Sequence, residues 1–382
     1  MNPTPPETPA RPAAAGEPRV HGEAIVYRLY DVGYEIHLDQ VVDLLASSAP
    51  ERPRPTRGEA QAIHIPNPPV RVSLGGETVT IADAPREAEF SARVFDFGVI
   101  SLRARLAAPP DCGWSDFTAF GAAISAAPGW ASAFARMRAR LLERIAPAIE
   151  RPGEAPVTED YVVFRVDRLE DAAGARRGAD ALRDEDIARL LVGESRPLSA
   201  ATHRELLSQR FSYFEDDLAV LTWNAALVVE PVAEDTDVQY VLEFANAQLL
   251  ELRFDDAMLD AEIPKINTRI AGARAGFHLL WRGFSRVLAD VQTRVADVTE
   301  LVERVENSLK VTDDVFLARI YAAALEIFRG ATWRRGIDRK LAILRDSYGM
   351  LNAESQARRA EMLEIVIVLL IGLEIVLTLL GR

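Results

Sequence analysis

The chain has 382 residues, of which 49% are hydrophobic and 26% are charged, and its formal net charge is −13. This length accommodates two or three domains. The acidic excess argues against a nucleic-acid-binding surface spread over the whole protein, because phosphate backbones are bound by Lys and Arg. Cys112 is the only cysteine, which excludes a disulfide framework and a cysteine zinc site within one chain.

Residues 1–20 are rich in proline and lack the apolar core of a secretory signal. Glu7 and Glu17 argue against a mitochondrial transit peptide, which is poor in acidic residues. We expect this segment to be a disordered tail.

Residues 21–232 combine strand and helix patterns. Ile25, Tyr27 and Leu29 alternate with period two, as in a half-buried strand. The run "VRVSLGGETVTIA" predicts a hairpin that turns at Gly75-Gly76. The run "EFSARVFDFGVISLRARL" is strand-like throughout, with Gly98 as a bulge or a point of close approach.

The second half of this region alternates between the two patterns. Residues 115–145 predict two helices separated by Pro128-Gly129, and a pair of strands is expected on either side of Trp223-Asn224. Strands and helices mix without a regular βαβ order. We therefore expect an α+β domain over residues 21–232.

Residues 235–361 have helical periodicity. A heptad seam with alternating spacings of four and three predicts a coiled coil. Its central residues are Phe284, Leu288, Val291, Val295, Val298, Val302, Val305 and Leu309. A second seam follows at Ile337, Leu341, Leu344, Tyr348 and Leu351. Two seams joined by a loop predict a long antiparallel helical hairpin, although an intermolecular coiled coil makes the same pattern.

Residues 362–381 resemble a membrane span. From Ile365 to Leu380, every residue other than Gly372, Glu374 and Thr378 is Val, Ile or Leu. The segment would be ~30 Å long as a helix, which matches a bilayer core. The apolar residues contribute roughly −0.3 to −0.6 kcal/mol each, which outweighs the ~2.5–3.5 kcal/mol cost of one buried acid. A transmembrane helix is therefore expected.

Four charged residues define the predicted membrane and oligomer contacts. Glu364 would lie at the headgroup level beside Arg358 and Arg359, while Glu374 would lie near mid-membrane. An acid at that depth is most simply protonated or hydrogen-bonded to another copy, and both favour a homo-oligomer. The alternative is a lone acid that is tolerated facing lipid. Basic residues precede the segment and only Arg382 follows it. The positive-inside rule then places the N-terminal bulk in the cytoplasm of a tail-anchored, single-pass protein.

The terminal motif is similar to that of the "required for meiotic nuclear division" family. The matching residues are Leu363, Glu364, Glu374 and Ile375, and the stretch Phe95–Leu102 also resembles a family strand. The resemblance implies a mixed α/β region, a helical stalk and a C-terminal membrane helix. Some members of that family act in the mitochondrial inner membrane and support translation. The Ala- and Arg-rich composition and the missing transit peptide favour a bacterial chain and its inner membrane, and the mitochondrial inner membrane is expected if the source is eukaryotic.

No catalytic motif, phosphate-binding loop or histidine pair is recognised, so we expect a non-enzymatic protein without a cofactor. Asp256 and Asp260 share a helix face that could hold a divalent ion, but a solvated acidic face is the commoner meaning.

Three functions are compatible with the sequence. The first is a membrane-anchored homo-oligomeric scaffold, with the lipid bilayer and a cytoplasmic protein as partners. The second is an enzyme or ligand-binding domain with an unrecognised site in residues 21–232. The third is an ion- or proton-conducting oligomer built around Glu374.

Overall fold

The computed structural model describes residues 17–48, 50–51, 67–153, 157–193, 196–231, 236–275, 293, 296 and 314–380. The chain divides into two compact units. The first, here called the sheet unit, comprises Met1–Phe254 and Asn307–Ala331. The second, the helical unit, comprises Asp255–Glu306 and Thr332–Arg382.

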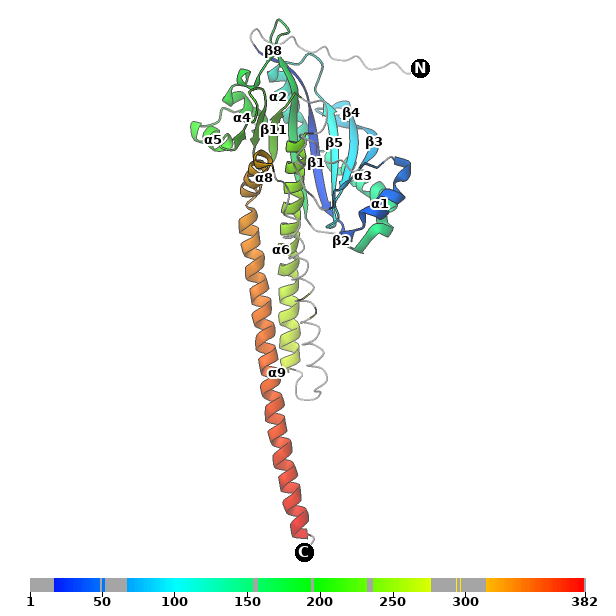
Figure 1. Cartoon of the computed structure of the whole chain (residues 1–382), viewed down its shortest axis with the longest axis vertical. Helices are drawn as coiled ribbons and strands as arrows, with labels where there is room; N and C mark the ends of the chain where they lie inside the picture. The colour runs from blue at the N-terminus through cyan, green and yellow to red at the C-terminus, as the bar shows by residue number, and fades with distance from the viewer. Residues whose placement is uncertain are drawn as a thin grey trace. The chain divides into compact units, whose positions relative to one another are not determined.

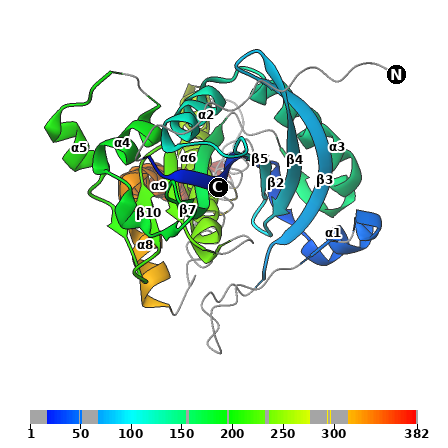
Figure 2. The same ribbon diagram turned by 90° about the horizontal axis from the view of Figure 1, so that it is seen from above.

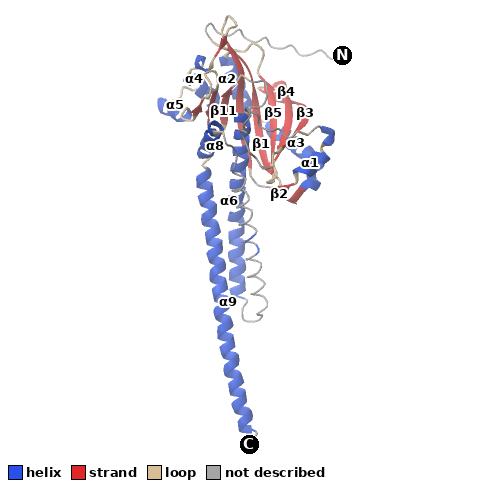
Figure 3. Cartoon of the chain, viewed as in Figure 1, coloured by secondary structure: helices blue, strands red, loops and turns tan. Residues whose placement is uncertain are grey.

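A large mixed sheet forms the centre of the sheet unit (Figure 1 and Figure 3). Its strands follow the order β3-β4-β5-β1-β7-β11-β10-β9, and the short β8 pairs with β7. β7 and β11 are parallel, whereas β1 pairs antiparallel with both β5 and β7. The bounds are β1 Arg19–Asp31, β3 Val70–Ile81, β4 Ala84–Val94, β5 Val99–Ala107, β7 Thr158–Glu170, β8 Arg176–Arg177, β9 Arg210–Phe211, β10 Leu218–Leu221 and β11 Ala225–Val229.

Short helices pack against one face of this sheet. Here α2 contacts β1, α4 contacts β11, and α3 contacts both β3 and β5. Figure 2 shows α3 beside β3 and β4. The bounds are α1 Leu38–Leu44, α2 Trp114–Ala126, α3 Trp130–Ile145, α4 Asp184–Val192 and α5 Ala200–Leu206. A separate two-stranded sheet joins β2 (Gly33–Ile36) to β6 (Ile149–Pro152).

The apolar core lies between these helices and the sheet. Val26, Phe164 and Leu102 belong to it from the strands, and Phe117 and Phe134 belong to it from the helices. Each such side chain stabilises the fold by ~1.5–3 kcal/mol when it is removed from water. The predicted helix pair separated by Pro128-Gly129 is confirmed by α2 and α3.

The opposite face of the sheet carries the first part of α6 (Asp237–Ala275) and α8 (Val315–Ile327). Phe244 of α6 packs edge-on against Phe95 and Phe97, with its ring centroid 6.0 Å from each of theirs. It also lies 6.2 Å from the ring of Tyr321 in α8. Aromatic contacts of this kind add to the energy of simple burial, so this cluster fixes α6 and α8 against the sheet.

The predicted hairpin at Gly75-Gly76 is wrong. These glycines lie inside β3, where the pairing register with β4 shifts between Ser73 and Gly75. The chain turns instead at Ala82 and Asp83, whose φ angles are +47° and +61°. Gly75, with φ +85°, therefore forms a bulge in a long strand, a role that glycine fills as readily as a turn.

The helical unit contains the end of α6 and most of α9 (Gly330–Leu380). Both helices run in the same direction along this unit in Figure 1. Lys340 of α9 joins them through Asp256 and Asp260, with Nζ–Oδ1 distances of 2.7 Å and 2.6 Å. The two acids therefore bind a lysine. In the described part of the chain, no group of three or more metal-ligating side chains is placed to hold a metal ion.

The predicted antiparallel hairpin and coiled coil is wrong for the part of the chain that the structure describes. Ile337, Leu341 and Leu344 of the second seam are buried, but the helix beside them, α6, is parallel to α9. The spacing of apolar residues identifies a buried face and not the helix that covers it, which explains the error. The first seam, from Phe284 to Leu309, lies outside the described residues.

The predicted transmembrane helix over residues 362–381 is also wrong. Within the described residues, no helix combines the length and the apolar character needed to cross a membrane. The same finding contradicts two further expectations, the single-pass, tail-anchored topology and the placement in a bacterial or mitochondrial inner membrane.

Candidate functional site: the charged face of the sheet

The sheet has one apolar face and one charged face. Ala24 and Val26 of β1 enter the apolar core, as do Leu102 and Ala104 of β5. Because side chains alternate along a strand, the residues between them point to the opposite side, toward α6. The buried polar residues on that side, here called the charged face, include Ser91, Arg93, Ser101, Arg103 and Arg165.

The centre of the charged face is a buried ion-pair cluster. Arg93 of β4 pairs with Glu243 of α6, and the two side chains are 3% and 0% exposed. The Nη1 of Arg103 lies 4.0 Å from the same carboxylate. Arg93 also stacks over the ring of Tyr240, 4.6 Å from its centroid. Removing these charges from water costs several kcal/mol each, so the cluster depends on all its members being present.

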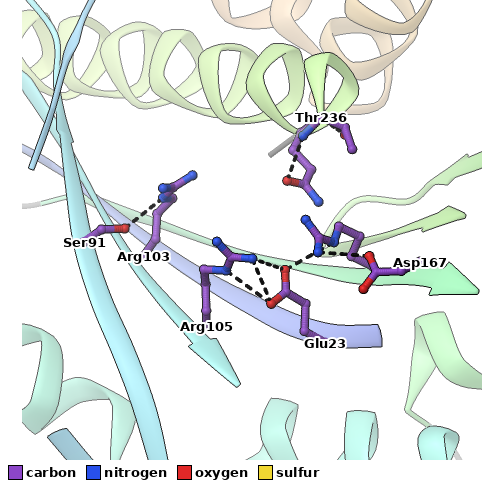
Figure 4. Close-up of polar contacts among 8 residues, drawn as sticks. Glu23, Ser91, Arg103, Arg105, Asp167 and Thr236 are labelled. Atoms are coloured by element: carbon purple, nitrogen blue, oxygen red, sulfur yellow. Dashed lines mark hydrogen bonds and ion pairs between the residues drawn. The ribbon is translucent and has the colours of Figure 1, made fainter. Parts of the chain in front are cut away.

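A second group of charges extends from β5 across β1 to β7 (Figure 4). Glu23 accepts hydrogen bonds from Arg105 Nη2 at 2.9 Å and from Arg105 Nε at 3.2 Å. Its Oε1 also lies 3.2 Å from Nε of Arg165, which pairs in turn with Asp167 at 2.9 Å. Burial raises the pKa of Asp167, and the charge of Arg165 opposes that rise.

The helix that covers this face begins with a capping box. The backbone N–H of Gln239 donates to Thr236 Oγ1 at 3.2 Å, and the backbone N–H of Thr236 donates to the Gln239 side chain at 3.3 Å. Figure 4 includes Thr236, and the next turn of α6 carries Tyr240 and Glu243, which contact Arg93. Two backbone donors that the helix itself leaves unpaired are satisfied, so the start of α6 is fixed next to the charges.

A cavity of about 320 Å³ opens on the same side of the sheet, at β3, β4 and β5. It is lined by Glu51, Arg71, Ser73, Gly75, Gly76, Glu89, Phe90, Ser91 and Arg105. Arg105 belongs to the Glu23 group, and Ser91 accepts a hydrogen bond from Arg103 Nε at 3.2 Å. The cavity therefore adjoins both charge groups.

Asp31, at the end of β1, is a further buried titratable group of the sheet unit. It is 6% exposed and accepts a hydrogen bond from the Gly33 N–H at 3.2 Å. Burial raises the pKa of Asp31 to about 7. The folded protein therefore binds this proton more tightly than the unfolded chain, whose aspartates have a pKa of about 3.9.

Stability contributed by the Asp31 proton is fully present at about pH 4 and is lost as the pH rises to about 7, at up to ~1.4 kcal/mol per pH unit. Asp31→Asn keeps an oxygen for Gly33 and removes the titration. The free energy of unfolding of the wild type, minus that of the variant, should fall across this range. A difference that stays constant with pH would contradict the prediction.

The residues predicted from the sequence lie elsewhere. Glu364 and Glu374 are exposed on α9, in the helical unit, whereas the charged face belongs to the sheet unit. Arg358 and Arg359 are also in α9, but their side chains lie outside the described residues. Sequence reasoning missed the charged face, although Arg93, Arg103 and Arg105 alternate with apolar residues along the run predicted as a strand, which the structure divides into β4 and β5.

The fold thus defines a mixed-sheet domain with one charged face, followed by a helical unit. The chain belongs to the family described as "Uncharacterized protein MJ0711, N-terminal domain", whose profile matches residues 21–236. It is 26% identical over 175 residues to "Uncharacterized protein MJ0711" of Methanocaldococcus jannaschii. That match covers 46% of this chain and 53% of the relative, so the chain spans about half the length of the curated protein that it matches. No solved structure matches the chain.

Proposed function

We propose that this chain is a self-associating interaction protein, in which the apolar end of α9 joins copies and the sheet unit is presented to a protein partner. One observation supports the proposal. Twelve large apolar side chains between Leu363 and Leu377 are 44% to 67% exposed in the single chain. Soluble monomers rarely expose a continuous apolar patch of more than a few hundred Å², so this segment requires cover.

The distribution of these side chains favours several copies over a pair. A helix that is apolar on every side is buried on every side, and a single neighbouring helix covers only one stripe. Ile365, Leu370 and Ile371 lie on different faces of α9, and each is more than half exposed. We therefore propose an assembly of three or more copies, with their α9 ends packed together. The relation to the meiotic nuclear division family stays a prediction.

Cysteine cross-linking tests the proposal. Cys112 is 0% exposed, and burial raises its thiol pKa to about 11, so it should not react. In Leu369→Cys, we expect mild oxidation to link most chains into covalent dimers, because equivalent positions of packed helices meet. The control is Glu205→Cys on exposed α5, which should stay monomeric on a denaturing gel. Equal cross-linking of the two variants, or none in Leu369→Cys, would overturn the proposed interface.

A further inference from the structure

The cavity at β3, β4 and β5 offers positive and negative groups at the same opening. Its lining includes the guanidinium groups of Arg71 and Arg105 and the carboxylates of Glu51 and Glu89. Ser73 and Ser91 add hydroxyl groups, and Gly75-Gly76 contributes backbone without side chains. Around Gly75, an added Cβ would meet no atom within 4 Å, so the β3 bulge leaves this wall open.

Two of the lining groups, Arg105 and Ser91, are oriented by hydrogen bonds with residues outside the cavity lining. Glu23 contacts Arg105 through Nε and Nη2 together, which fixes the plane of the guanidinium group. Arg103, which is 1% exposed, donates its Nε–H to Ser91 Oγ at 3.2 Å. With its oxygen accepting from Arg103, the Ser91 hydroxyl has its own hydrogen left to donate. Groups oriented in this way bind a ligand with little further ordering cost.

We propose that this cavity binds a small polar metabolite through an oxyanion, either a phosphate or a carboxylate. Arg71, Arg105 and Ser91 receive the anionic group, because guanidinium and hydroxyl donors match its oxygens. Glu51 and Glu89 accept hydrogen bonds from hydroxyl groups elsewhere on the molecule. The volume of about 320 Å³ is at the small end of ligand pockets, which suits a sugar phosphate or a sugar acid.

Calorimetric titration of the full chain distinguishes the two anions. The probes are ribose 5-phosphate, its carboxylate counterpart ribonate, and uncharged ribose. We expect saturable binding of ribose 5-phosphate or of ribonate, and at least tenfold weaker binding of ribose, because charge-assisted hydrogen bonds are absent from ribose. The acid that binds more tightly identifies the natural anion. Absence of saturable binding for both acids at millimolar concentration would overturn the site.

Matched arginine variants locate the binding. Arg71→Gln should weaken the anion about tenfold to a hundredfold, the range for one charge-assisted hydrogen bond. The control is Arg86→Gln, an exposed position on β4 outside the cavity lining, which should bind as the wild type does. Equal losses in the two variants would show a general charge effect and refute the cavity as the site.

A third variant tests the site with a substitution that should not disturb folding. Ser73 is exposed on β3 and lines the cavity, so Ser73→Asp should leave thermal unfolding unchanged. Its added negative charge should lower anion affinity at least tenfold. Wild-type affinity in a folded Ser73→Asp protein would contradict the proposal. This site is independent of the α9 interface, so either proposal can fail alone.

Discussion

Glu243→Leu should lower the free energy of unfolding by ~3–5 kcal/mol, the cost of breaking a buried ion pair by removing one partner. The substitution removes the carboxylate that faces both Arg93 and Arg103. The two guanidinium groups are 3% and 1% exposed, so water cannot replace the lost charge without opening the contact between α6 and the sheet. Denaturant unfolding followed by circular dichroism measures the loss.

Two further proteins separate this effect from a simple change of residue. Glu326→Leu alters an exposed glutamate on α8 and should change stability by less than ~0.5 kcal/mol. The double variant Arg93→Leu with Glu243→Leu should recover part of the loss, because an apolar pair of similar volume replaces a buried ion pair at little cost. A Glu243→Leu protein within ~1 kcal/mol of the wild type would show that the cluster is not buried as described.

Gly98→Ala should destabilise the sheet unit by ~3 kcal/mol or more, through strain combined with a clash. Gly98 has φ +95°, and a Cβ added there would lie 1.9 Å from the carbonyl oxygen of Gly33. That neighbour is a backbone atom of β2, which cannot rotate away as the end of a side chain would. Thermal unfolding monitored by circular dichroism gives the difference.

Gly174→Ala is the matched control for this substitution. Gly174 has φ +80°, but nothing lies within 4 Å of the position of an added Cβ. It should therefore lose only the ~1–2 kcal/mol of left-handed strain, and the excess in Gly98→Ala measures the close approach to Gly33. Equal losses in the two variants would contradict the clash.

The sheet unit shows what a sequence pattern can and cannot specify. The period-two pattern of Ile25, Tyr27 and Leu29 correctly predicts a strand, and the strands on either side of Trp223-Asn224 are confirmed. Gly98 is the expected point of close approach. The hairpin at Gly75-Gly76 failed because a glycine pair serves a bulge as well as a turn, and only the pairing with β4 distinguishes the two.

The charged face was not predictable as a site. Alternation shows that Arg93 and Arg103 each share a face of their strands with other polar residues. Arginines on a solvent-exposed face alternate in the same way, so the pattern does not show that these two are buried. What buries them is α6, more than a hundred residues later in the chain, and local periodicity contains no information about that contact. The cavity depends likewise on strand order, which places Arg71 and Arg105 at one opening.

The α9 segment failed for a different reason. Its composition predicts that the segment is buried in apolar surroundings. The same composition is expected whether lipid or another protein chain covers the segment. The inference of a bilayer depended on summed insertion energies, whereas no helix in the described part of the chain is long and apolar enough to cross a membrane. The exposed apolar side chains therefore indicate a need for cover, and the choice of another copy of the chain is our proposal.

Sedimentation equilibrium without lipid tests the central claim most directly. The full chain is compared with a chain that ends at Met362, which lacks the apolar end of α9. We predict that the full chain has the mass of three or more copies, independent of concentration over the micromolar range, and that the shortened chain has the mass of one copy. A full chain that sediments as a single copy, or that disperses only as single copies in detergent or lipid, would contradict assembly through α9.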